Sequence, residues 1–171
     1  MVKKIVFLVF IASTLTFTAC SSGGGRMLIT NEEKKADARI EQMLSVIEDK
    51  DKEAMKALFS KQALDEIKDF DSGIDYLISF FKGDVKSWQR DKWSSDESTR
   101  DGKKSIMLRS WYTVETDKGK YMFFIIDYTE DTINPDNAGL YTLRVIKAED
   151  KDAQFTYWQD MAMAGIYKPE E

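Results

Sequence analysis

Apolar residues in the amino-terminal half of the chain recur every three or four positions, a spacing that predicts three helices. Thr30 and Glu33 form a capping-box pair, which marks the start of the first helix. The apolar positions that follow share one helix face: Ala36, Ile40, Met43, Leu44 and Ile47. The pattern therefore predicts a first helix over residues 31–49.

Aspartate residues mark the starts of two further helices. Asp51 caps a shorter second helix, which Ser60 interrupts before the apolar pattern continues to Ile67. Asp71 precedes a third helix, and Gly83 ends it because glycine readily adopts the left-handed conformation that closes a helix.

After Gly83 the apolar residues alternate with polar ones, which predicts a β-sheet. Strands are expected at residues 85–93, 104–116, 120–128, 140–147 and 154–158. The strand at 120–128 is apolar on both faces, so we expect it at the centre of the sheet.

The strand at 104–116 divides its side chains into two sets. One face carries Ile106, Leu108, Ser110, Tyr112 and Val114, and the other carries Met107, Arg109, Trp111, Thr113 and Glu115. Only one of these sets can face the helices, and the alternation leaves open which one does.

A separate apolar run opens the chain. Lys3 and Lys4 precede an unbroken apolar stretch, and Phe17-Thr18-Ala19-Cys20 closes the segment. This order is typical of a secretory signal with a lipoprotein cleavage box, in which a diacylglyceryl group is attached to the cysteine sulfur before cleavage. We therefore expect a signal peptide at 1–19 and a membrane anchor through lipid on Cys20, at the extracytoplasmic face. An ordinary secreted protein and an uncleaved anchor are the alternatives.

Composition changes after the signal. The stretch SSGGG favours a flexible tether over residues 20–30, followed by a single domain at 31–168. Loss of Lys3 and Lys4 leaves 23 basic and 30 acidic residues, a net charge of −7. An acidic domain argues against nucleic acid as a partner. Cys20 is the only cysteine, so no disulfide is expected once it carries lipid.

Helices followed by an antiparallel meander define an α+β fold, with three N-terminal helices packed on a curved sheet and a cavity between them. The segments at residues 49–60 and 77–83 resemble the helix junction and the lead into the first long strand of the nuclear transport factor 2-like superfamily, whose domains are cone-shaped. The chain is also similar to uncharacterised lipoproteins of monoderm bacteria that carry such a domain of unknown function. The resemblance covers residues 32–167 and implies a fold and a location, but no activity.

The absence of histidine removes several kinds of chemistry. Ser-His-Asp and Cys-His catalysis and histidine metal sites are excluded because the chain has no histidine. Lipid on Cys20 also excludes thiol chemistry and cysteine-bound zinc. No cofactor is expected.

Asp127 is the one candidate for a catalytic base. It ends the series Tyr121, Phe123 and Ile125 on one strand face, and a carboxylate on an apolar wall can act as a general base. The alternative is a structural aspartate near the strand end, which either faces solvent or pairs with Arg109 or Arg144.

An acidic loop after the central strand is a candidate metal site. Asp131 and Asp136 lie in this loop, which could hold calcium outside the cell, or serve only as turn residues.

Aromatic residues of the predicted strands can stack on ligands. The ligand-binding candidates are Trp88, Arg109, Trp111, Tyr112, Asp127 and Tyr141, and Trp93, Tyr157 and Trp158 are further strand aromatics.

Three functions fit this sequence. The leading hypothesis is a non-enzymatic binding module for a small ligand, a cell-wall fragment or a partner protein. The second is an isomerase- or hydrolase-like enzyme that uses carboxylate and tyrosine chemistry centred on Asp127. The third is an accessory subunit that forms a homodimer through its sheet.

Overall fold

The structure, a computed structural model, describes residues 30–169. Cys20, the predicted signal peptide and most of the predicted tether lie outside the described residues. The helices are α1 (Asn31–Asp49), α2 (Lys52–Leu58), α3 (Lys61–Glu66), α4 (Phe70–Phe80), α5 (Lys151–Gln154) and α6 (Trp158–Met161). The strands are β1 (Val85–Arg100), β2 (Lys103–Thr116), β3 (Gly119–Asp131), β4 (Gly139–Lys147) and β5 (Gly165–Ile166), and short 3-10 turns are η1 (Pro135–Asn137) and η2 (Ala148–Asp150).

From residue 30 onward, four helices precede the sheet, so the prediction of three is wrong. The predicted second helix is divided at Phe59, whose backbone is extended. Ser60 then starts α3, because its hydroxyl accepts a hydrogen bond from the Ala63 N–H at 3.1 Å. The first helix has its predicted bounds, and both bonds of the capping box at Thr30 are present.

The sheet has the order β1-β2-β3-β4-β5 and is mixed, which corrects the expected antiparallel sheet. The first three pairings are antiparallel, whereas β5 runs parallel to β4 through the pairs Thr142–Gly165 and Leu143–Ile166. Gly165 has a φ of +84° and lies against Ile67, where a side chain would clash. Strand β5 is thereby held against β4 and α4.

The ends of the sheet differ most from the sequence prediction. The first strand was expected to end at Trp93 but continues to Arg100. The last strand, expected at residues 154–158, is absent: α5, an extended link and α6 occupy that region. Phe155 and Trp158 of this segment pack on Phe124 of the central strand instead of pairing at an edge. Their burial against the sheet favours a covering segment over a further strand.

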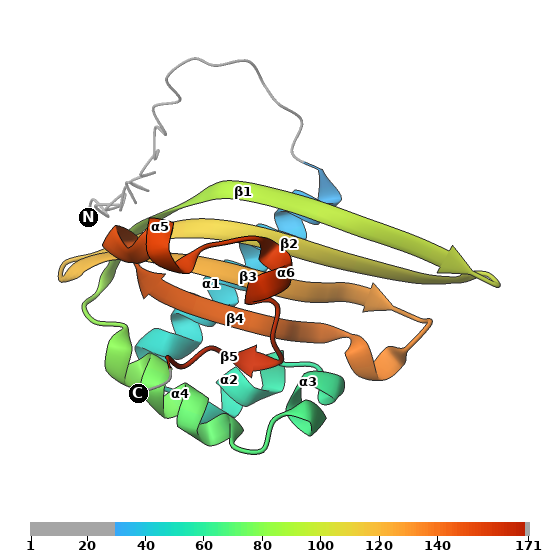
Figure 1. Ribbon diagram of the computed structural model, residues 1–171, viewed down its shortest axis with the longest axis horizontal. Coiled ribbons are helices and arrows are strands. Elements are labelled where there is room, and N and C mark those ends of the chain that lie inside the picture. Colours follow the sequence, from blue (N-terminus) through green and yellow to red (C-terminus); the bar gives the residue numbers. More distant parts are fainter. Residues whose placement is uncertain (1–29, 170–171) are drawn as a thin grey trace, which may run out of the picture.

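Figure 1 shows that helices α1 to α4 lie on one face of the sheet, called the inner face here, while α5 and α6 lie on the opposite, outer face. The inner face holds the main core, which includes Tyr112, Tyr121 and Phe123. These side chains have no exposed area, so packed residues fill the space where a cavity was expected. The Tyr112 set of β2 is thus the one that faces the helices.

Candidate functional site

A β-bulge in β1 decides which of its side chains reach each face. Before the bulge, Arg90 lies opposite Tyr112, whose side chain is on the inner face. After it, Lys92 lies opposite Trp111, whose side chain is on the outer face. The extra residue, Asp91, reverses the alternation at this point. The side chain of Arg90 therefore points to the helices, whereas that of Lys92, two residues later, points to the outer face.

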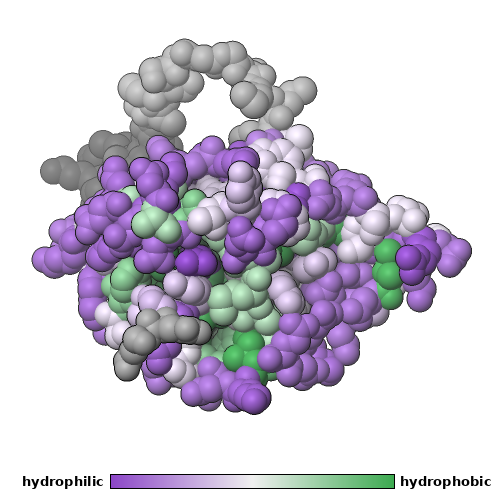
Figure 2. All heavy atoms as spheres, in the orientation of Figure 1, coloured by the Kyte–Doolittle hydropathy of each residue, from purple (hydrophilic) through white to green (hydrophobic). Residues whose placement is uncertain are grey.

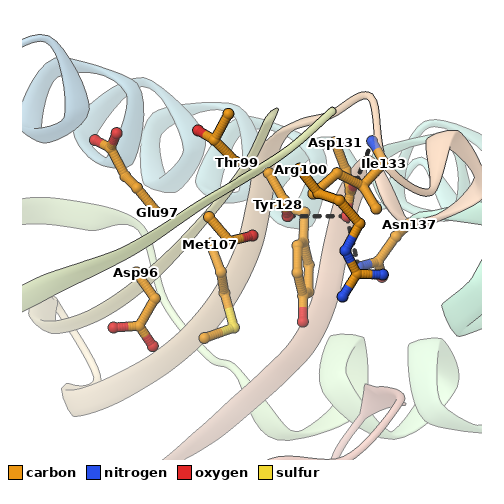
Figure 3. Close-up of a pocket in the computed structure, with 11 residues that line it drawn as sticks. Asp96, Glu97, Thr99, Arg100, Met107, Tyr128, Asp131, Ile133 and Asn137 are labelled. Atoms are coloured by element: carbon orange, nitrogen blue, oxygen red, sulfur yellow. Dashed lines mark hydrogen bonds between the residues drawn. The ribbon is translucent and has the colours of Figure 1, made fainter. Parts of the chain in front are cut away.

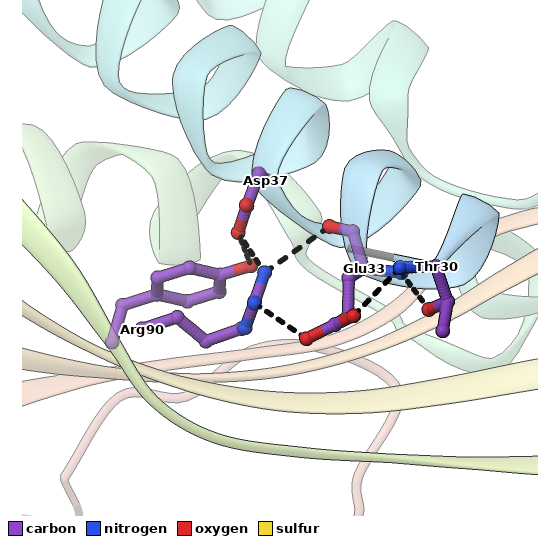
Figure 4. A network of polar contacts seen from close by, with 5 residues as sticks. Thr30, Glu33, Asp37 and Arg90 are labelled. Carbon is purple, nitrogen blue, oxygen red and sulfur yellow. Dashed lines mark hydrogen bonds and ion pairs between the residues drawn. The ribbon is translucent and has the colours of Figure 1, made fainter. Parts of the chain in front are cut away.

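Arg90 joins the inner face to the start of α1 (Figure 4). Its guanidinium bonds Asp37 Oδ1 at 2.6 Å and Glu33 Oε1 at 2.8 Å, and the Tyr112 hydroxyl donates to the same Asp37 oxygen at 3.1 Å. The Thr30 N–H bond to Glu33 holds the pKa of that carboxyl below its usual value. Burial, followed by the nearby Asp37 charge, raises the pKa of Tyr112. This network is a structural clamp in which each charge has a partner.

Asp127 is buried on the inner face, with 3% of its surface exposed. Arg39 of α1 donates to both carboxylate oxygens, from Nε at 2.9 Å and from Nη2 at 3.2 Å. Its partner is therefore neither Arg109 nor Arg144, the two that the sequence suggested. A cavity of about 230 Å³ lies beside the pair and is lined in part by Thr129. The bidentate pairing commits the carboxylate that was the candidate base.

The outer face carries an open groove between the sheet and the segment at residues 151–158, called the aromatic groove here. Its volume is about 460 Å³. Six residues define its character: Lys92, Trp111, Lys151, Phe155, Tyr157 and Trp158. Tyr157 is 79% exposed. Figure 2 shows the outer face as a whole, with hydrophobic surface mainly over the region of β4 and β5 and mostly hydrophilic side chains over α5 and around the margin.

The floor of the aromatic groove is rigid. Trp111 packs on Phe124 with ring centroids 4.9 Å apart, and Phe124 in turn contacts Phe155 at 6.4 Å. Phe124 itself is fully buried in the central strand. The partly exposed rings are thereby held in place by the sheet, which limits the entropy lost when a ligand stacks on them.

The charged groups of the aromatic groove are mostly uncommitted cations. The Lys92 ammonium lies 5.0 Å from the centre of the Trp111 ring. Between residues 30 and 169, no carboxylate lies within ion-pair distance of Lys92 or Lys151. Asp91, at the rim, accepts hydrogen bonds from Thr113 at 2.7 Å and Gln89 at 3.0 Å. Two lysines and one aspartate therefore line the groove of an otherwise acidic protein.

Arg109 lies on the outer face of β2, two residues before Trp111, and packs against Trp158. Its guanidinium carbon lies 4.1 Å from the centre of the Trp158 ring, and its Nη2 pairs with Asp96 at 2.9 Å. Nε donates to Ser94 at 3.1 Å. Arg109 is only 7% exposed. It therefore positions Trp158 and the β1 strand, and its charge is used within the protein.

A second cavity, called the hairpin cavity here, lies under the projecting end of β1 and β2 (Figure 3) and has a volume of about 460 Å³. Met107 and Tyr128 provide its apolar wall, and Arg100 reaches it from the hairpin. Trp111 of the groove and Met107 of this cavity are four residues apart on one strand face, which corresponds to about 13 Å. Both cavities therefore open on the outer face.

Asp131 organises the polar end of the hairpin cavity. One carboxylate oxygen accepts from the Ile133 and Asn134 N–H groups at 3.0 and 2.7 Å, and the other accepts from Ser105 and Asn137 at 3.0 and 3.1 Å. Burial acts to raise the pKa of Asp131, but these donors together hold it below its usual value. The carboxylate closes the turn after β3.

Asp131 and Asp136, the predicted calcium ligands, do not point into one shared site. Asp136 points away to pair with Lys61 at 3.0 Å, while Asp131 is occupied by the hydrogen bonds of its own turn. Among residues 30–169, no group of three or more cysteines, aspartates and glutamates is arranged to hold a metal ion.

The six predicted ligand-binding residues do not converge. Arg109 and Trp111 share the outer face, whereas Tyr112 and Asp127 are on the inner face and Trp88 packs on Tyr112 at 5.6 Å. The sixth, Tyr141, donates to Glu66 of α3 at 2.7 Å, and its burial together with that bond raises its pKa to about 12.

Sequence reasoning missed six residues that line the groove: Asp91, Lys92, Met122, Lys151, Phe155 and Thr156. The aromatic run near residues 155–158 was a usable signal, but it was assigned to a strand. Lys92 gave no signal, because its position on the outer face depends on the bulge.

Taken together, the described residues form an α+β domain with a mixed five-stranded sheet, four helices on its inner face and two cavities on its outer face. The chain belongs to the family described as a domain of unknown function (DUF5104), which matches residues 42–148. The match spans β1 to β4, while the wall of the groove at residues 151–158 lies beyond it. A search of curated proteins finds no match. No helix in the described part of the chain is long and apolar enough to cross a membrane.

Proposed function

We propose that this protein is a lipid-anchored, extracytoplasmic binding protein that holds a small ligand in the aromatic groove. The observation that carries the proposal is the groove itself, a cavity of about 460 Å³ lined by four aromatic rings and two lysines. This volume and this mixture of apolar walls with a few polar groups are typical of small-molecule sites.

The location rests on the amino-terminal sequence. Lys3 and Lys4, the apolar run and the box that ends at Cys20 favour export followed by attachment of lipid to the sulfur. The SSGGG stretch gives the domain a flexible connection to the membrane surface. We extend the proposal to the fold family: four helices against one face of a twisted sheet support a nuclear transport factor 2-like cone.

The polar groups of the inner face do not favour an enzyme, because they hold α1 on the sheet. Both oxygens of Asp127 accept from Arg39, and the Tyr112 hydroxyl donates to Asp37. The Asp127 carboxylate keeps lone pairs beyond these two bonds, but a general base must direct one of them at its substrate, and the pair with Arg39 fixes Asp127 toward α1. The groups proposed for carboxylate and tyrosine chemistry are instead used to hold α1 on the sheet.

A ligand-observed NMR screen tests the groove. The full-length chain in detergent would be mixed with a library of neutral and charged fragments. We expect fragments whose binding is lost in Tyr157→Ala and kept in Tyr76→Ala, a tyrosine of α4 on the other side of the sheet. If no fragment depends on Tyr157, the groove is not a binding site and the proposal fails.

Radiolabelled palmitate tests the anchor separately. We expect label in the wild-type chain and none in Cys20→Ala, and the unlabelled variant should keep its uncleaved signal segment. Equal labelling of both chains, or a native protein that begins at Met1, would contradict lipid attachment at Cys20.

A further inference from the structure

We infer that the aromatic groove takes an anionic saccharide, with the sugar ring stacked on the aromatic side chains and its carboxylate or phosphate held by Lys92 and Lys151. This inference deepens the proposed function and rests on it. It names a ligand class that combines an apolar ring face with negative charge.

The rings in the groove present faces rather than a closed apolar pocket. Trp111, held against Phe124, is half-buried at the floor, and Tyr157 stands almost free at the rim. The pyranose ring of a sugar has axial C–H groups on one face, and these carry partial positive charge that complements the negative face of an aromatic ring. Such a ligand can stack without being enclosed, as an open groove requires.

The lysines supply the charge preference. Lys92 of β1 and Lys151 of α5 both line the groove. Asp91 is the one carboxylate that also lines it, and its two oxygens accept hydrogen bonds from Thr113 and Gln89. An anion in the groove would therefore meet two lysines and a single carboxylate, whose oxygens already have hydrogen-bond donors.

A peptide ligand fits the groove less well. Extended peptides gain affinity by adding a strand to a free sheet edge, through main-chain hydrogen bonds. The groove lies over β1, β2 and β3, and the ladder pairs Lys92 with Trp111 at its floor. The free edge of β1 lies beside the groove rather than on its floor, so recognition on the floor comes from side chains, as in sugar binding.

Tryptophan fluorescence titration of the full-length chain in detergent tests the inference. Three probes are compared: the neutral trimer of N-acetylglucosamine, the trimer of galacturonic acid, and the acidic tripeptide Glu-Tyr-Glu. We expect the galacturonic acid trimer to bind about tenfold more tightly than the neutral trimer, as one charge-assisted hydrogen bond allows. The double variant Lys92→Gln/Lys151→Gln should lose that tenfold preference. The matched control Lys34→Gln/Lys103→Gln removes the same charge from exposed lysines elsewhere and should keep it.

The results separate the two proposals. Equal binding of both trimers, or a preference that survives in Lys92→Gln/Lys151→Gln, overturns the anionic class. Tighter binding of the tripeptide overturns the saccharide. If no probe binds while the fragment screen still finds ligands that depend on Tyr157, the saccharide inference is wrong but the groove remains a binding site. If the fragment screen is also empty, the proposed function fails with it.

Discussion

The two faces of the sheet use the same kinds of side chain for different ends. On the inner face, Asp127 and Arg90 are charged, yet each is paired with α1 through short hydrogen bonds. On the outer face, Lys92 and Lys151 border an open groove without a carboxylate partner in the described chain. Charge that is paired stabilises the fold, and charge that is left free is available to a ligand.

The aromatic residues show the same difference. Phe123 and Phe124 are adjacent in β3 and both are fully buried, but they point to opposite faces. Phe123 packs under four helices as part of the main core, whereas Phe124 is covered by the short segment at residues 151–161. The outer layer is thin, so it can present rings to solvent while the inner layer cannot.

The largest expected effect is on the packing of the inner face. Phe123→Ala should lower the free energy of unfolding by about 3–5 kcal/mol, because it leaves a cavity that four anchored helices cannot fill. Phe124→Ala should cost less, about 2–3 kcal/mol, because the short outer segment can settle onto the gap. Urea unfolding measures both. A greater loss for Phe124→Ala would reverse the ranking of the two faces.

The pair between Asp127 and Arg39 gives the next effect. Arg39→Met leaves a buried carboxylate without its partner and should cost about 2–3 kcal/mol, below the value for a fully buried pair because the Arg39 side chain is 20% exposed. Adding Asp127→Leu should restore part of the loss. A double-mutant cycle by urea unfolding would show this coupling. Additive losses would mean that the two groups do not act as a pair.

Acid should weaken the clamp at Arg90. The folded pKa of Glu33 lies below its ordinary value of 4.5, so the stability it contributes is present above pH 4.5 and is lost as the pH falls through the folded pKa. Wild type should therefore lose its stability advantage over Glu33→Gln across that range. Chemical unfolding at several pH values measures it, with Glu41→Gln, an exposed residue of the same helix, as the control. A constant difference between wild type and Glu33→Gln would rule out this titration.

Features that depend on neighbouring residues could be predicted from the sequence, whereas contacts between residues far apart in the chain could not. Alternation and helical spacing predicted the strands from Lys103 to Lys147 and the bounds of α1, because burial of one face imposes a local period. Residues 94–100 contain no apolar residue, so the predicted strand ended at Trp93. The bulge at Asp91 adds one residue without a turn signal, so the position of Lys92 on the outer face was missed. The partner of Asp127 lies 88 residues away, a separation that no periodicity records. The groove depends on the bulge and on a contact between segments far apart in the chain, so only its aromatic residues could be anticipated.

The smallest expected effect on stability is at the rim of the groove. Tyr157 is 79% exposed, so Tyr157→Ala should change the free energy of unfolding by no more than about 0.5 kcal/mol. The same change should weaken ligand binding severalfold, because a stacking surface is lost. Thermal melts and fluorescence titration together test this separation. A large drop in stability would place Tyr157 in the fold rather than in a site.

Backbone amide NMR of the full-length chain with the galacturonic acid trimer tests the central claim most directly. The account predicts saturable shifts at Lys92, Trp111 and Lys151, with the α1 residues around Arg39 unchanged. Shifts confined to the helix side of the sheet, or to the hairpin cavity near Arg100, would contradict it.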